Sequence, residues 1–177
     1  SYQKKTGHRA YLHNLDVVKD KVTIETSLAN IDKISREYYK EYSNSKNIEK
    51  FSLAYKENLL QFSEEYNSAD INVTTSPISN QLLDKIYSND LLFESFILWI
   101  NILCEVFDEI NFMTYKNDFT TNFAEHSWDG NHIYPESFNE NFAVINKKNI
   151  QYTKLLTKKN LPAYIDELKE QRKILKK

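Results

Sequence analysis

The sequence contains few of the residues that interrupt regular structure. It has two glycines and three prolines in 177 residues, whereas average usage is about 7% for glycine and 5% for proline. Sheets depend on tight turns, which usually require glycine, proline or an Asn-Gly pair. This scarcity argues against a fold built mainly of strands and favours an all-α protein with long helices.

Cysteine is also scarce, because Cys104 is the single one in the chain. An intramolecular disulfide is therefore excluded, and one cysteine does not indicate a redox compartment. Cys104 lies in the apolar run FILWINILCEVF, where we expect a buried, unreactive thiol. The opening residues, SYQKKTGHRAYL, contain no apolar segment typical of a signal peptide. These observations leave the localisation of the protein open.

Apolar residues recur at steps of three and four, the spacing that predicts amphipathic helices. The pattern runs from Arg9 to about Ser43 and, after the turn SNSKN, resumes from Ile48 to Tyr66. Further helices are predicted at 77–87, from 91 to about 122, at 135–158 and at 163–177. The prediction is an all-α, elongated helical bundle of four or five main helices, with residues 1–177 in a single domain.

Several helix ends carry capping signals. Ser76 followed by Pro77 is a strong start signal, with serine as N-cap and proline in the first helical position. The SND sequence at 88–90 can cap the helix that follows it. Pro162 is expected to break or kink a helix, with Asn160 as a cap.

The segment LLFESFILWINILCEVFDEINFM, residues 91–113, is apolar on nearly all sides. A helix of this kind is expected at the centre of a bundle. A transmembrane span needs about 20 mainly apolar residues, but here only residues 95–104 are free of charge. We therefore predict the central buried helix of the fold rather than a membrane span.

Charge is distributed unevenly along the chain. Residues 89–146 hold one basic and ten acidic side chains, and residues 147–177 hold ten basic and three acidic ones. We expect these two segments to lie together and offset each other. The alternative is contact of the basic C-terminal helix with an anionic membrane surface. Because the acidic middle would repel phosphate, no nucleic-acid partner is predicted.

Residues 125–132, EHSWDGNH, form the densest group of reactive side chains. His126, Asp129 and His132 offer donors that zinc accepts, but the H-x2-D-x2-H spacing matches no closed zinc signature. The glycine and asparagine are typical of a turn. We predict a polar loop with Trp128 packed onto the bundle. The candidate ligand or partner site in this loop comprises His126, Trp128, Asp129 and His132.

A metal site is the alternative interpretation of the histidines. His8 and His13 form a second pair near the start of the chain. If the four histidines converged, the metal ligands would come from the set His8, His13, His126, Asp129 and His132.

Other patterns suggest no chemistry. Glu105, Asp108 and Glu109 share one helix face, but no histidine accompanies them as in di-metal bundles, so we expect a solvated acidic face. The chain shows no recognisable Ser-His-Asp spacing, phosphate-binding glycine loop or Cys-His pair. No catalytic residue and no cofactor are therefore predicted.

Three stretches, RAYLHNLDVVKD, NVTTSPISNQLLDKIYSND and ENFAVINKKNIQYTKLLTKKN, together span most of the chain. In their order of helix, Ser/Thr-rich loop and helix, they resemble a family of bacterial proteins of unknown function. Members of that family carry one N-terminal transmembrane helix and a helical soluble domain, and the transmembrane segment is absent from this sequence. The resemblance implies that the parent protein is membrane-tethered, and it supplies no catalytic residues.

The function predicted from these patterns is that of a non-catalytic helical binding, sensing or scaffold module. Its partner would be a protein or a small ligand, and the oligomeric state is not predicted. Two alternatives remain open. One is a metal-dependent enzyme or toxin-like protein that uses the histidines, and the other is a protein–protein inhibitor or immunity factor.

Overall fold

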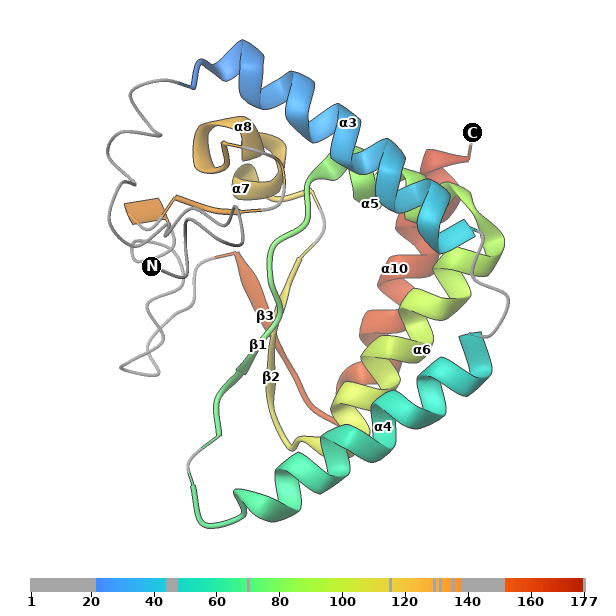
Figure 1. Cartoon of the computed structure of the whole chain (residues 1–177). Coiled ribbons are helices and arrows are strands. Elements are labelled where there is room, and N and C mark those ends of the chain that lie inside the picture. The colour runs from blue at the N-terminus through green and yellow to red at the C-terminus, as the bar shows by residue number, and fades with distance from the viewer. Residues whose placement is uncertain are drawn as a thin grey trace.

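The structure, a computed structural model, describes residues 22–43, 48–69, 71–114, 116–128, 130, 132–134, 136–137 and 152–176. Figure 1 shows that this part of the chain is mostly helical, with the helices arranged around a small three-stranded sheet. The helical prediction is confirmed in this coarse form. The prediction of an all-α fold is wrong in one respect, because the described residues include this sheet.

Helices dominate both halves of the described part, and the short strands lie between them along the chain. In chain order, the elements are α3 (Ile24–Ser43), α4 (Ile48–Glu65), β1 (Val73–Thr74), α5 (Asn80–Ser88), α6 (Asp90–Val106), β2 (Ile110–Met113), α7 (Asp118–Thr121), α8 (Phe123–His126), β3 (Thr153–Leu156) and α10 (Leu161–Leu175).

The helices α3 and α4 confirm the first two predicted helices over these ranges. Residues 9–21 of the first prediction lie outside the described part. α3 packs against α5 and α8, and its contact face buries Ser27, Ile31 and Ser35. α4 packs against α6 and leaves Leu53 and Phe62 largely exposed. The apolar face of α4 is thus only partly covered by the described residues.

Polar side chains fix where α5 and α6 begin. The Ser79 hydroxyl accepts a hydrogen bond from the Leu82 N–H at 3.4 Å, and the Asn89 side chain caps α6 in the same way, as the SND sequence predicts. The cap predicted at Ser76 is wrong by three residues. The cause lies in the preceding residue, Thr75, whose N–H donates to the carbonyl of Asn111 in β2. This bond holds the segment to the sheet, so the helix begins only beyond it.

The helix α6 lies at the centre of the described part, as predicted. It contacts α3, α4, α5 and α10. Its buried residues are Leu92, Phe93, Phe96, Ile100, Ile102, Leu103 and Cys104. Among the helices described, none is long and apolar enough to cross a membrane.

The sheet closes one side of the core. Its middle strand, β2, pairs in parallel with β1 and antiparallel with β3. Ile110 and Leu156 lie opposite each other in this sheet and are fully buried. The Phe112 ring packs edge-on against Phe96 of α6 and Tyr164 of α10, with centroids 6.0 and 5.7 Å apart. The sheet is therefore held to two helices by aromatic contacts.

Strands replace parts of two predicted helices. The helix predicted from 91 to about 122 ends at Val106, because Phe107 has an extended backbone and β2 follows. The helix predicted at 135–158 is wrong over Thr153–Leu156, which form β3; its residues 138–151 lie outside the described part. β2, with the sequence INFM, is a short apolar run, and such runs do not distinguish a strand from a buried helix. β3, with the sequence TKLL, is half polar and too short to show a clear alternation.

The last helix begins earlier than predicted. α10 starts at Leu161 with Pro162 in its first turn, where proline fits the helix without loss of a hydrogen bond. Asn160 occupies the N-cap position, but its side chain is used elsewhere. Its Oδ1 accepts from the Thr157 N–H at 2.8 Å and its Nδ2 donates to the Leu155 carbonyl at 2.9 Å. Pro162 therefore opens the helix rather than breaking it.

The basic helix α10 lies against the start of α6. Arg172 and Lys176 form ion pairs with Asp90, and the Arg172 guanidinium lies 4.5 Å from the centroid of the Phe93 ring. Hydrogen bonds from Lys176 and Arg172, followed by their positive charges, lower the pKa of the Asp90 carboxyl. The predicted approach of the acidic and basic segments is confirmed at this contact.

Candidate functional site

The loop that contains the predicted site is a tight turn lying on α3. Ser127 and Ile133 form an isolated antiparallel bridge. Between them, Gly130 has a φ of +84° and its N–H donates to the Ser127 hydroxyl at 2.9 Å. A β-carbon at position 130 would lie 2.7 Å from the Ile31 Cα. Glycine is therefore required both for the backbone conformation and for the close approach to α3.

Trp128 packs onto the helical body, as predicted. Only 8% of its surface is exposed, and its carbonyl accepts from the Asn30 Nδ2 of α3 at 3.0 Å. Its ring stacks on His132, with planes 10° apart, and packs against Tyr134 at a centroid distance of 5.2 Å. The indole thus faces the protein's own side chains, while His132 is exposed.

The two described histidines of the loop rest on different rings. The His126 ring stacks on Phe119, with centroids 4.1 Å apart and planes at 6°. Its Nδ1 lies 3.1 Å from the Ser137 Oγ. His132, in contrast, stacks on Trp128. Each imidazole thus stacks on an aromatic neighbour of its own.

The remaining predicted metal ligands, His8, His13 and Asp129, lie outside the described residues, so their approach to His126 and His132 stays untested. Within the described ranges, no group of three His, Cys, Asp or Glu side chains is arranged to hold a metal ion.

The prediction that Glu105, Asp108 and Glu109 share one helix face is wrong, because α6 ends at Val106. All three carboxylates are exposed, and the first pairs with a lysine of α4.

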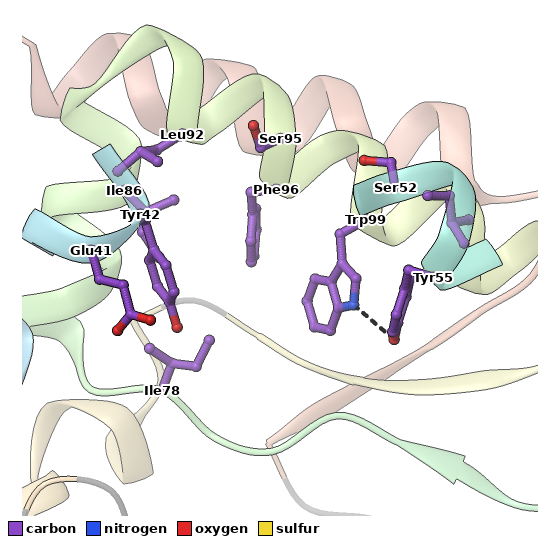
Figure 2. Close-up of a pocket in the computed structure, with 11 residues that line it drawn as sticks. Glu41, Tyr42, Ser52, Tyr55, Ile78, Ile86, Leu92, Ser95, Phe96 and Trp99 are labelled. Carbon is purple, nitrogen blue, oxygen red and sulfur yellow. Dashed lines mark hydrogen bonds between the residues drawn. The ribbon is translucent and has the colours of Figure 1, made fainter. Parts of the chain in front are cut away.

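A cavity that the sequence did not indicate lies between α3, α4 and α6. It measures about 550 Å³. In Figure 2, Tyr42 from α3, Tyr55 from α4, and Phe96 and Trp99 from α6 surround the same space, and Ile78 closes it from the segment before α5. Ligand pockets commonly measure about 300–1,000 Å³ and have mainly apolar and aromatic walls. The cavity has the size and lining for one small ligand.

The aromatic walls of the cavity are fixed by contacts among themselves. The Trp99 Nε1–H donates to the Tyr55 Oη at 3.2 Å, the bond dashed in Figure 2. The Trp99 ring also packs against Phe96 and Phe112, with centroids 5.7 and 5.8 Å apart. The rings facing the cavity are thus held in place by α4, α6 and β2.

One edge of the cavity is polar. Glu41 and Tyr42 lie in the last turn of α3, and Figure 2 shows the Glu41 carboxylate close to the Tyr42 hydroxyl. Burial, followed by the charges of Tyr38 and Glu41, raises the pKa of the Tyr42 phenol. A second negative charge is therefore disfavoured at this edge.

A second hollow of about 420 Å³ lies beside Cys104, between α6 and α10. Cys104 is 1% exposed, which confirms the predicted burial, and that burial raises the pKa of its thiol. Four of the other eight described lining residues are charged, namely Glu105, Lys158, Asp166 and Lys169. This mixture of both signs of charge suits a solvated groove between two helices.

Sequence reasoning missed the cavity because its residues have ordinary apolar spacing. Tyr42 and Tyr55 fall on the predicted apolar faces of two helices, and Phe96 and Trp99 fall in the central apolar run. One signal was present in the use of tyrosine on those faces. A tyrosine carries a hydroxyl that needs a partner or water, so several together suggest an incompletely filled region.

Comparison of the chain with protein-family models, with curated proteins and with solved structures gave no match. A functional proposal therefore depends on the geometry of the described residues.

Proposed function

We propose that the protein is a non-catalytic binding module that takes a small, mainly apolar ligand into the cavity between α3, α4 and α6. The observation that carries this proposal is the convergence of Tyr42, Tyr55, Phe96 and Trp99 on one space of about 550 Å³. Burial of apolar surface contributes about 25 cal/mol per Å². A ligand that covers these rings would therefore gain its affinity mainly from apolar contact.

The turn at Gly130 supports binding less well. Its tryptophan is already buried against His132 and Tyr134, so little of that ring is available to a ligand. A binding surface in this region would have to be formed by the exposed face of His132 and its neighbours. The prediction that this loop contacts a ligand or a protein partner is independent of binding at the cavity.

The proposal can be tested with a neutral, apolar fluorescent probe, N-phenyl-1-naphthylamine. We expect saturable binding of one probe per chain and a change in Trp99 fluorescence. Because the chain has two tryptophans, Trp128→Phe leaves Trp99 as the sole reporter. Ile78→Phe places a larger side chain at the cavity wall and should weaken binding by about tenfold or more, a change of at least 1.4 kcal/mol.

The matched control is Leu53→Phe, which makes the same kind of enlargement on the exposed face of α4, where Leu53 is 61% exposed. Binding to this variant should equal that of the unmodified protein. The proposal fails if the probe does not bind saturably, or if Ile78→Phe and Leu53→Phe have the same effect.

We also propose that this module belongs to a membrane-tethered protein, on the basis of its resemblance to membrane-anchored bacterial proteins. A surface contact through α10 has weaker support. Arg172 and Lys176 pair with Asp90, and Lys169 and Lys173 pair with Asp166 and Glu170, so part of the positive charge is offset. Expression from the complete gene followed by membrane fractionation tests the tether, and recovery in the soluble fraction would contradict it.

A further inference from the structure

The described lining of the cavity carries negative charge and no positive charge. Among the eleven described residues that line it, Glu41 is the one that carries a formal charge at neutral pH. No ion pair joins Glu41 to another described residue. Lysine, arginine and histidine are absent from this lining. An anionic head group would therefore meet a carboxylate and find no cation among the described walls.

The hydrogen-bonding groups of the lining lead to the same conclusion. The Trp99 Nε1–H is already donated to the Tyr55 Oη, and the Ser95 hydroxyl donates to the Leu91 carbonyl at 2.7 Å. The ionised Glu41 carboxylate can only accept hydrogen bonds. Two of the donors around the cavity are thus used within the protein, while a charged acceptor remains at its edge.

The aromatic rings suit a cation as well as an alkyl chain. The Tyr42 ring lies beside Glu41, at the edge of the same space that Phe96 and Trp99 border. The face of an aromatic ring carries partial negative charge and attracts a cation placed over it. A carboxylate next to a tyrosine ring therefore provides two attractions for one positive head group, and the deeper rings provide an apolar surface for its tail.

We infer that the ligand is an amphipathic amine, with its alkyl part against Phe96 and Trp99 and its cationic head at Glu41 and Tyr42. This inference depends on the proposed binding function and adds the chemical class of the ligand. Burial, then the charge of Tyr38 and last the charge of Glu41 raise the pKa of the Tyr42 phenol, and the negative charge of Glu41 would also attract a cation.

The test uses three probes with one tail and different heads: octyltrimethylammonium, octan-1-ol and octanoate. Binding is followed at low salt by Trp99 fluorescence in the Trp128→Phe protein and by calorimetry. We expect the ammonium to bind about fivefold more tightly than the alcohol, as one partly exposed cation–aromatic and charge contact allows. Octanoate should bind more weakly than the alcohol.

Glu41→Gln keeps the size of the side chain and removes its charge. In this variant, the ammonium should lose most of its advantage over octan-1-ol and keep only the part that the Tyr42 ring contributes, while the affinity for octan-1-ol should not change. Glu57→Gln is the matched control, because Glu57 is an exposed glutamate of α4 outside the cavity lining. This control should preserve the fivefold preference.

The outcomes separate the two proposals. If none of the three octyl compounds binds, the binding function itself fails. If the alcohol binds but the ammonium has no advantage, or octanoate binds most tightly, the binding function stands and the cationic class is wrong. If the ammonium is preferred but Glu41→Gln keeps that preference in full, the assignment of the head-group site to Glu41 is overturned.

Discussion

The two tryptophans of this protein lie in opposite environments. Trp128 fills its site completely, between His132 and Tyr134 in a turn pressed onto α3. Trp99 is only half-buried and borders a cavity, with its indole N–H bonded to Tyr55. The loop at 125–132, which has the most reactive side chains, is thus tightly packed around Trp128. The cavity is instead lined by aromatic residues such as Trp99, whose spacing in the sequence is that of an ordinary core.

Helix α3 joins these two regions. Its first half carries Asn30 and Ile31, which contact the turn, and its last turn carries Glu41 and Tyr42 at the edge of the cavity. Because each region uses a different part of the same helix, each can be altered separately. A substitution in the turn can therefore be compared with one at the cavity, and each region serves as the reference for the other.

The largest difference is expected between Trp128→Ala and Trp99→Ala. Removal of a fully packed tryptophan leaves a new void and should lower the free energy of unfolding by about 3–5 kcal/mol. Trp99→Ala enlarges an existing cavity and should cost about 1–2 kcal/mol, less than the burial of a complete side chain contributes. Urea unfolding followed by circular dichroism measures both variants.

The corresponding phenylalanine variants provide a milder pair in case Trp128→Ala does not fold. Trp128→Phe should still be the less stable of the two. Equal losses, or a larger loss at Trp99, would show that the cavity is closed in solution and that the contrast between the two tryptophans is wrong.

A smaller effect is expected from Gly130→Ala, which tests the turn alone. A non-glycine residue in the left-handed conformation costs about 1–2 kcal/mol, and the added β-carbon would also press on the Ile31 backbone. Overpacking of this kind costs about 1–3 kcal/mol. We expect a total loss of about 2–5 kcal/mol in urea unfolding, with probe binding at the cavity retained. A loss below about 0.5 kcal/mol, typical of surface sites, would contradict the close contact.

Helices and helix caps that depend on residues close together in the chain were predicted from the sequence. The helices α3, α4 and α6 follow from apolar spacing, and the Asn89 cap follows from the SND sequence. The cap at Ser79 was missed because a bond from Thr75 to β2 delays the start of α5. Apolar spacing and capping residues thus predict helices well, except where the backbone is hydrogen-bonded to a strand that is distant in the sequence.

The sheet and the cavity depend on residues far apart in the chain. The pairing of Ile110 with Leu156 decides that both segments are strands, but neither four-residue segment, INFM or TKLL, has a periodicity that distinguishes a strand from a helix. The cavity requires three helices to meet at a particular spacing, which no single periodicity encodes. In the loop, by contrast, the turn and the burial of Trp128 were predictable. A glycine in a polar segment indicates a turn, and a single tryptophan in that segment is expected to pack onto the neighbouring helices.

The hydrogen bond from Asn30 to the Trp128 carbonyl should contribute less than the packing around it. Asn30→Ala removes the donor and should lower the free energy of unfolding by about 1 kcal/mol, the usual net value of one such bond. Asn30→Asp keeps the size of the side chain but cannot donate when ionised, so a similar loss is expected at pH 7. If the aspartate variant matches the unmodified protein, this bond does not hold the turn.

The smallest effect should come from the loss of one carboxylate charge in acid, at the contact between α6 and α10. The wall helix α6 is tied to α10 by the ion pairs of Asp90 with Arg172 and Lys176. The pKa of Asp90 is lowered in the folded protein from its ordinary value of 3.8. Its contribution to stability is therefore present above about pH 4 and is lost as the pH falls through the folded-state pKa.

Asp90→Asn should accordingly be less stable than the unmodified protein at pH 6, and the difference should shrink below pH 4. Urea midpoints at a series of pH values measure this change. Asp118→Asn is the matched control, because Asp118 also lies in the first turn of a helix, and no ion pair joins it to another of the described residues. A difference between Asp90→Asn and the unmodified protein that stays constant from pH 6 to 3 would mean that the Asp90 charge does not tie α6 to α10.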